Sequence, residues 1–122
     1  MVFIPTEIKL HQKSRLLEVH FDNGKSFEYS CEYLRVYSPS AEVKGHGPGQ
    51  EILQLDKEEV NINSIEPVGN YAVKLCFDDG HDTGLYSWTY LYKLGIERDK
   101  LWQNYLDRLK EIGHSRREIE KA

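Results

Sequence analysis

Cysteine is scarce in this chain of 122 residues, which contains only Cys31 and Cys76. Two thiols can form at most one bridge, so a disulfide framework is excluded, and we expect two separate buried thiols in a reducing compartment. Long apolar runs are also missing, since none approaches the roughly 20 residues of a membrane-spanning helix. Residues 1–5 are apolar but too short for a signal peptide. We therefore expect a cytoplasmic protein that contacts no membrane.

An excess of positive charge is absent as well. The chain has 16 basic and 20 acidic residues, which gives a formal net charge of −4. Such a chain does not attract a phosphate backbone by electrostatics, so nucleic acid is excluded as the main partner. The composition, with 39% hydrophobic and 30% charged residues, is that of a folded domain, and the length suits one such domain.

Alternating polar and apolar residues predict antiparallel strands. The clearest pair is a hairpin around Asp22-Asn23-Gly24, whose residues tolerate positive φ. Residues 66–70, which contain Pro67 and Gly69, and the pair Asp79-Gly80 predict two further turns. The predicted strands span residues 7–11, 16–21, 26–30, 50–55, 60–65, 71–77 and 83–86, with 71–77 as the central one.

Three helices complete the predicted fold. Residues 31–37 form a short helix that Pro39 ends. Ser87 is typical of an N-cap and Gly95 of a C′ position for a helix over 88–94. The last helix spans 98–112 and ends at Gly113. Its apolar residues share one face, namely Leu101, Trp102, Tyr105, Leu106, Leu109 and Ile112.

These elements predict an α+β domain over residues 1–113. It consists mostly of antiparallel β-sheet, with a short helix and a longer C-terminal helix. Residues 114–122 are polar and are expected to form a frayed tail.

Residues 34–50 have neither helical nor strand periodicity and contain two prolines and three glycines. A small domain seldom keeps so long an irregular connection unless the connection has a function. Its expected neighbour is the turn 77–82, where His81 stands among three carboxylates, those of Asp78, Asp79 and Asp82. Together the two segments indicate a site.

Several motifs in this order resemble those of one family, the gamma-butyrobetaine hydroxylase-like N-terminal domain, and most closely its stand-alone bacterial members. The resemblance implies a small β-rich α+β domain. In carnitine-pathway hydroxylases this domain precedes an iron- and oxoglutarate-dependent oxygenase domain and binds a structural zinc through three cysteines and one histidine. A similar domain ends some plastid iron–sulfur carriers. The motifs lie at residues 33–43, 45–50, 65–73, 77–82, 86–88 and 90–91.

The zinc ligands do not carry over to this sequence. The three cysteine positions correspond to Ser38, Ser40 and Val43, and His81 matches the ligand histidine. Zinc prefers thiolate and imidazole donors, whereas a serine hydroxyl stays protonated at neutral pH and valine has no donor atom. We therefore predict no zinc site of this kind. We expect a corner closed by a buried Val43, by serines that cap backbone groups and by His81 bound to a carbonyl or carboxylate.

Two alternatives for the site remain open. In one, His46 and His81 join the nearby aspartates in a replacement site for zinc, iron or manganese, as a small metal-binding protein or metal-dependent enzyme would need. In the other, the site is a small-molecule or anion pocket, in which Gly45, Gly47 and Gly49 present their backbone N–H groups to the ligand. Arg35 either clamps a partner carboxylate or bonds within the loop, and we favour the internal role.

We interpret the chain as a non-catalytic binding or accessory module, with no cofactor predicted. The family's association with oxygenases and iron–sulfur carriers suggests a protein partner in metal-cofactor metabolism. The protein itself is expected to be a monomer, or a homodimer whose interface centres on Trp102. The candidate binding residues are Arg35, Tyr37, His46, Gly47, Gly49, Asp79 and His81.

Overall fold

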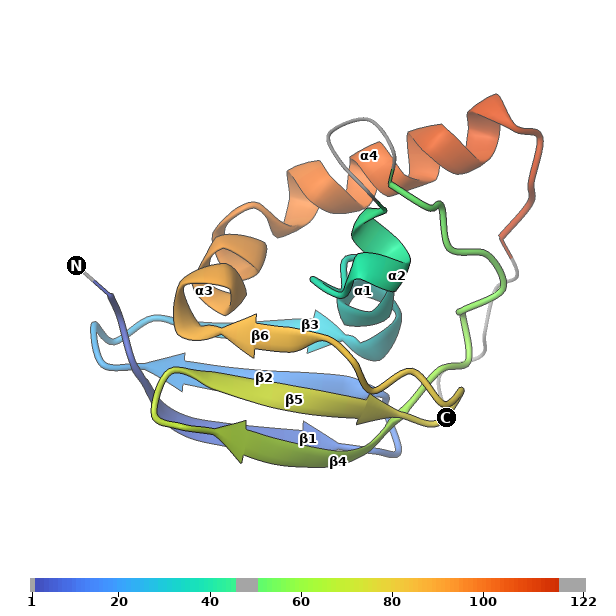
Figure 1. Cartoon of the computed structure of the whole chain (residues 1–122). Helices are drawn as coiled ribbons and strands as arrows, with labels where there is room; N and C mark the ends of the chain where they lie inside the picture. The colour runs from blue at the N-terminus through green and yellow to red at the C-terminus, as the bar shows by residue number, and fades with distance from the viewer. Residues whose placement is uncertain (1, 46–50, 117–122) are drawn as a thin grey trace.

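The computed structural model describes residues 2–45 and 51–116. Its strands form two antiparallel sheets with the orders β1-β2-β3 and β4-β5-β6. Figure 1 shows the helices gathered on one side of both sheets. The elements are β1 (Pro5–His11), β2 (Leu16–Phe21), β3 (Ser26–Ser30), α1 (Cys31–Val36), α2 (Ala41–Lys44), β4 (Ile62–Val68), β5 (Ala72–Phe77), β6 (Leu85–Ser87), α3 (Trp88–Ile96) and α4 (Arg98–Glu111).

One apolar core joins the two sheets to the helices. Leu17 and Val19 of β2 belong to the same buried cluster as Leu75 and Phe77 of β5. Every residue of α1 is buried, because this helix runs directly on from β3 and packs among sheet, α3 and α4 residues. The expected α+β class, with antiparallel sheets and a longer C-terminal helix, is confirmed.

Buried tyrosines fasten the helices to this core through their hydroxyl groups. Tyr29 donates to the carbonyl of Leu91 at 2.7 Å, and Tyr33 donates to that of Leu94 at 2.7 Å. Both acceptors lie in α3, so the aromatic bodies fill the core while the hydroxyl groups occupy helix carbonyls.

Three element boundaries differ from the prediction. Residues 51–55 form no strand, and residue 50 lies outside the described part of the chain. The expected turn at 66–70 is shorter, because β4 continues through Pro67 to Val68. Proline is tolerated there since β4 is an edge strand. The supposed loop also contains the helix α2, which Ser40 caps.

The prediction that Gly95 ends α3 is wrong, since the helix continues to Ile96. The reason for a glycine here is close packing: a Cβ atom at Gly95 would lie within 2.9 Å of three ring atoms of Phe27 in β3. The predicted apolar face of α4 is correct except at Ile112, which follows the helix and is 58% exposed.

The side chain of Trp102 packs against other residues of the same chain. Its ring contacts those of Tyr33 and Tyr105, and the guanidinium group of Arg116 lies over it. Trp102, at which a homodimer interface was expected to centre, thus also makes contacts within its own chain, where it is half-buried. Arg116 also hydrogen-bonds the buried carboxylate of Glu32, so residue 116 packs against α1.

Candidate functional site

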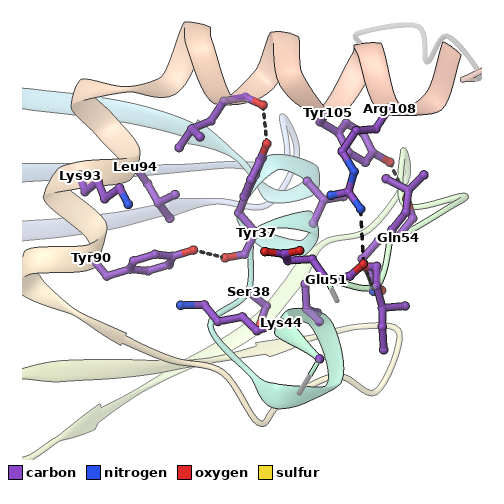
Figure 2. Close-up of a pocket in the computed structure, with 16 residues that line it drawn as sticks. Tyr37, Ser38, Lys44, Glu51, Gln54, Tyr90, Lys93, Leu94, Tyr105 and Arg108 are labelled. Atoms are coloured by element: carbon purple, nitrogen blue, oxygen red, sulfur yellow. Dashed lines mark hydrogen bonds between the residues drawn. The ribbon is translucent and has the colours of Figure 1, made fainter. Parts of the chain in front are cut away.

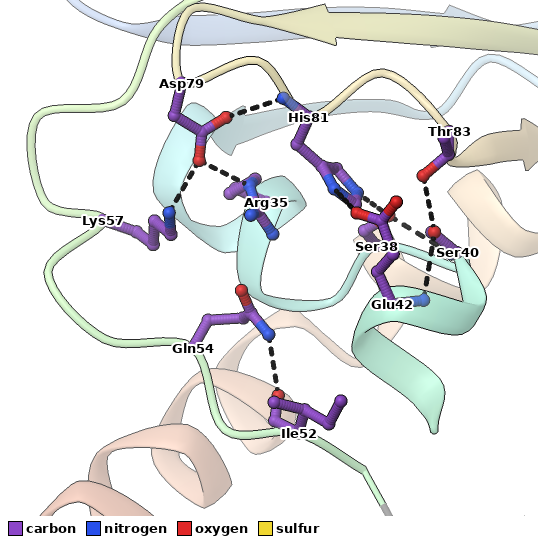
Figure 3. Close-up of polar contacts among 10 residues, drawn as sticks. All are labelled: Arg35, Ser38, Ser40, Glu42, Ile52, Gln54, Lys57, Asp79, His81 and Thr83. Carbon is purple, nitrogen blue, oxygen red and sulfur yellow. Dashed lines mark hydrogen bonds and ion pairs between the residues drawn. The ribbon is translucent and has the colours of Figure 1, made fainter. Parts of the chain in front are cut away.

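The end of α1, the start of α2 and the turn after β5 meet in a cluster of polar side chains, which we call the polar corner. Figure 3 shows how its side chains point toward one another. Ser38 Oγ lies 2.8 Å from His81 Nε2, and Ser40 Oγ lies 2.6 Å from Thr83 Oγ1. The corner consists of Arg35, Ser38, Ser40, Glu42, Lys57, Asp79, His81 and Thr83.

Local backbone chemistry positions these groups. Ser40 caps α2 by accepting from the N–H of Glu42 at 3.3 Å, and Ser38 Oγ accepts from the N–H of Ser40 at 3.2 Å. On the facing turn, Gly80 adopts φ +88, which favours glycine. A Cβ at Gly84 would collide with Ser38 Oγ, so this glycine lets the turn approach the serine. The expected capping role of both serines and the burial of Val43 are confirmed.

His81 lies between a serine and a glutamate. Its Nδ1 is 3.1 Å from Glu42 Oε2 and its Nε2 faces Ser38 Oγ. A carboxylate only accepts, so Nδ1 carries the proton and Nε2 accepts from the serine hydroxyl. Burial lowers the pKa of His81, and the charge of Arg35 lowers it further, although Glu42 acts in the opposite direction. The imidazole is therefore neutral at pH 7.

Ser38, His81 and Glu42 share the connectivity of a nucleophile, a base and an orienting carboxylate. Ser38, however, is only 1% exposed, and its Oγ already accepts a backbone N–H. The imidazole of His81 is buried too, with 2% of its side chain exposed. The arrangement therefore closes the corner and presents no nucleophile to a substrate.

Arg35 and Lys57 share the carboxylate of Asp79. Arg35 Nε lies 2.8 Å and Lys57 Nζ 2.7 Å from Asp79 Oδ2, while Oδ1 accepts the N–H of His81 at 3.1 Å. Burial alone would raise the pKa of Asp79, but these three donors outweigh it and lower the pKa to about 2. Arg35 thus has the expected internal role, with a carboxylate of the turn as acceptor in place of a loop carbonyl.

The zinc-binding positions of the related domains contain no matching donor set here. The hydroxyl groups of Ser38 and Ser40 are hydrogen-bonded to His81 and Thr83, and the buried Val43 has no donor atom. His81 is the one good ligand among these positions. Within residues 2–45 and 51–116, no three His, Cys, Asp or Glu side chains gather in a way that suits a metal ion. The residues present do not fit a structural zinc.

A cavity of about 560 Å³ lies beside the corner, between α1, α2, α3, α4 and the segment 51–54. Figure 2 shows its lining side chains, with Lys93 and Tyr90 on α3 and Tyr105 and Arg108 on α4. Tyr37 lines this cavity; its hydroxyl donates to the carbonyl of Leu101 at 2.6 Å. The cavity belongs to the same part of the fold as the predicted loop.

The structure thus separates the predicted binding residues into groups. Arg35, Asp79 and His81 meet in the polar corner, whereas Tyr37 lines the cavity. His46, Gly47 and Gly49 lie outside the described residues, so the two-histidine metal site and the glycine anion site stay predictions. Sequence reasoning missed the cavity residues of α3 and α4, because helical periodicity explains their apolar members as core and their cations as solvated side chains.

The chain belongs to the gamma-butyrobetaine hydroxylase-like N-terminal domain family, whose pattern matches residues 8–92. This confirms the resemblance drawn from the motifs. No curated protein matches the chain. Among described residues, no helix is long and apolar enough to cross a bilayer.

Three solved structures are similar to this chain. Two are protein structures determined in solution by NMR. One has 58% sequence identity and a TM-score of 0.82, covering 98% of this chain and 89% of that one. The other has 46% identity and a TM-score of 0.83, with coverage of 98% and 94%. The third is a crystal structure of a protein of unknown function from Acidithiobacillus ferrooxidans, of the DUF971 family. It has 38% identity and a TM-score of 0.63, covering 75% of this chain and 91% of that one.

Proposed function

We propose that this chain is a non-catalytic binding module and that the polar corner is its working surface. The observation that carries the proposal is the guanidinium group of Arg35. Its side chain is 9% exposed, and its Nη1 has no hydrogen-bond acceptor among the residues the structure describes. A buried donor without an acceptor costs about 1–3 kcal/mol. A carbonyl or carboxylate of a protein partner would satisfy this buried donor if the more accessible side chains of the corner, Glu42 and Lys57, move aside on binding.

The surroundings of Arg35 support recognition of a partner. The carboxylate of Asp79 is shared by two cations, so the trio of Arg35, Lys57 and Asp79 has a net charge of +1. Nearby, Glu42 extends from α2 with 64% of its side chain exposed. A protein surface that brings a carbonyl or carboxylate to Arg35 meets accessible charges of both signs at its edge, which favours specificity.

The same contacts argue against catalysis. Ser38 and His81 of the corner are buried. Cys31 is buried, and burial raises the pKa of its thiol to about 11. A thiol with so high a pKa is a poor nucleophile at neutral pH. None of these three groups is placed to react with a substrate.

For the biological setting, we propose that the partner is a cytoplasmic protein of metal-cofactor metabolism, such as an iron–sulfur carrier or an iron-dependent oxygenase. Membership of a family whose related domains adjoin both kinds of protein supports this choice. Cys31 and Cys76 are both unpaired thiols, as suits a reducing compartment.

Affinity capture with quantitative mass spectrometry tests the proposal. Tagged wild-type protein should enrich an iron–sulfur carrier or an iron-dependent oxygenase from cell extract. The variant Arg35→Gln, and the surface variants Glu42→Lys and Lys57→Glu, should lose that protein at least tenfold. The control Lys25→Glu changes an exposed charge of the β2–β3 turn and should capture as the wild type does. Equal capture by the corner variants, or enrichment of neither class of protein, would refute the proposal.

A further inference from the structure

The cavity between the helices has the volume and the apolar lining of a small-molecule site. Its volume of about 560 Å³ falls within the range of roughly 300–1,000 Å³ that is common for ligand pockets. Apolar side chains from five separate segments of the chain form much of its lining, namely Val36, Val43, Leu53, Leu94 and Leu101.

The tyrosine hydroxyl groups that line the cavity already donate hydrogen bonds to backbone carbonyls. Tyr37 donates to Leu101, Tyr90 donates to the carbonyl of Tyr37 at 2.6 Å, and Tyr105 donates to that of Gln54 at 2.8 Å. Burial raises the pKa of Tyr90 to about 12, so this phenol stays neutral. The three tyrosines therefore offer a ligand their aromatic rings more than their hydrogen-bond donors. Such walls suit a hydrocarbon body better than a sugar or another polyhydroxyl compound.

Three cations stand around this apolar space. Lys44 comes from α2, Lys93 from α3 and Arg108 from α4, and Figure 2 shows them on different sides of the cavity. Among the described residues that line the cavity, Glu51 is the only carboxylate, so these residues have a net charge of +2 in a chain of net charge −4.

The positive charge of the lining is not neutralised by ion pairs to described carboxylates. Within residues 2–45 and 51–116, Lys44 lies over the ring of Tyr90, at 4.9 Å from its centroid, and Arg108 donates one long bond of 3.4 Å to the backbone carbonyl of Glu51. None of the three cations forms a salt bridge to a carboxylate of these described segments. A ligand with an anionic head group would complement the positive charge of Lys44, Lys93 and Arg108.

We propose that the cavity binds a small amphipathic carboxylate, with an aliphatic or aromatic body against the apolar lining and its head group at Lys93 and Arg108. The planar fork of Arg108 suits a carboxylate in particular, because it can donate two parallel hydrogen bonds. This site goes beyond the protein-partner function, since it uses α3 and α4 instead of Arg35 and Asp79. Loss of one activity does not require loss of the other.

Octanoate is a suitable probe, with octan-1-ol as its uncharged counterpart. Titration of ¹⁵N-labelled protein, followed by NMR, should shift the amide signals of Leu94 and Leu101 on addition of octanoate. The dissociation constant should be below ~1 mM, which corresponds to about −4 kcal/mol. Octan-1-ol should bind at least tenfold more weakly, because it lacks the charge that the three cations complement.

Charge variants locate the head group. Lys93→Glu and Arg108→Gln should each weaken octanoate binding at least tenfold. Lys100→Glu and Lys110→Glu change exposed cations of α4 that do not line the cavity, and they should alter binding less than twofold. Equal binding of octan-1-ol, shifts confined to residues away from the cavity, or equal weakening by the control variants would overturn the proposal. Wild-type protein that captures its protein partner but does not bind octanoate would refute the ligand site alone.

Discussion

At the scale of single residues, His81 determines how the polar corner is held. In related zinc-binding domains a metal ion joins this position to three thiolates. Here the imidazole joins Ser38, which lies between α1 and α2, to Glu42 on α2 by two hydrogen bonds. Structural zinc contributes about 10–16 kcal/mol in finger peptides, whereas a hydrogen bond contributes about 1 kcal/mol. The corner must therefore rely on packing as well, and both Val36 and Val43 are buried.

We expect the stability of the fold to depend on the protonation of His81. Its pKa in the folded state lies below the value of about 6.5 that an unfolded chain gives. The unfolded state then binds more protons in this window, so stability rises with pH. The contribution is complete above about pH 6.5 and declines as the pH falls through the folded pKa. Urea unfolding between pH 8 and pH 5 measures this decline.

The variant His81→Gln separates this effect from that of the other histidines. It should lose about 1–3 kcal/mol at pH 8, because Ser38 loses its acceptor in a buried site. Its stability should then fall less than that of the wild type as the pH drops to 5. Thr89→Ala, a change at an exposed residue that does not titrate, should keep the wild-type slope. An identical slope in His81→Gln and wild type would contradict the prediction.

At the scale of elements, the close contact between α3 and β3 depends on Gly95, which has no Cβ atom. Gly95 lies inside α3, where glycine is ordinarily about 1 kcal/mol worse than alanine. The ring of Phe27 fills the space that a Cβ would take. The helix thus accepts a poorer intrinsic propensity so that it can lie close to the sheet. The preference of glycine for the C′ position placed Gly95 at the helix end in the prediction, since the sequence does not reveal which residue opposes it.

Gly95→Ala should therefore destabilise the fold by about 1–3 kcal/mol, as overpacking does, instead of stabilising it. Thr89→Ala changes an exposed residue of the same helix and should leave the free energy of unfolding within about 0.5 kcal/mol of the wild type. Chemical denaturation gives both values.

A second substitution tests the proposed cause. Phe27→Leu should reduce the cost of Gly95→Ala, because a smaller side chain leaves room for the new methyl group. A double-mutant cycle would show this as a coupling energy of more than about 0.5 kcal/mol. A Gly95→Ala variant more stable than the wild type would show that the helix has space to shift.

At the scale of the whole molecule, residues far apart in the chain complete the burial of α1. Glu32 is 5% exposed, and its carboxylate accepts two hydrogen bonds from Arg116, with 2.8 Å between Nε and Oε2. The same guanidinium group lies over the ring of Trp102 in α4, at 5.3 Å from its centroid. The segment after α4 thereby holds the buried helix and α4 together.

Arg116→Ala should cost about 2–4 kcal/mol in the free energy of unfolding, because it leaves the Glu32 charge buried without a partner. Lys110→Ala, at an exposed cation of α4, should change stability by less than about 0.5 kcal/mol. Adding Glu32→Gln to Arg116→Ala should recover part of the loss, since the buried charge is then removed. A cost below 0.5 kcal/mol for Arg116→Ala would show that this ion pair contributes nothing net. Urea titrations at pH 7 decide between these outcomes.

The sequence by itself determined most of the strands, the hairpin at Gly24, the N-cap of α3, and the family. These features follow from neighbouring residues: period-two alternation, a positive φ at glycine and a serine hydroxyl that accepts a nearby N–H. It also placed Arg35, Asp79 and His81 in one site, because the family motifs that contain them are local. Local patterns are readable since their energies depend on residues a few positions apart.

Only the tertiary structure decided how those residues are used. The pairing of Arg35 with Asp79 spans 44 positions and that of Glu32 with Arg116 spans 84. The cavity arises where α3 and α4 face α1 and α2, and no sequence pattern marks Lys93 or Arg108 as its neighbours. Such contacts depend on how whole elements pack against a shared core, and their partners are specified jointly by many weak interactions rather than by adjacent residues.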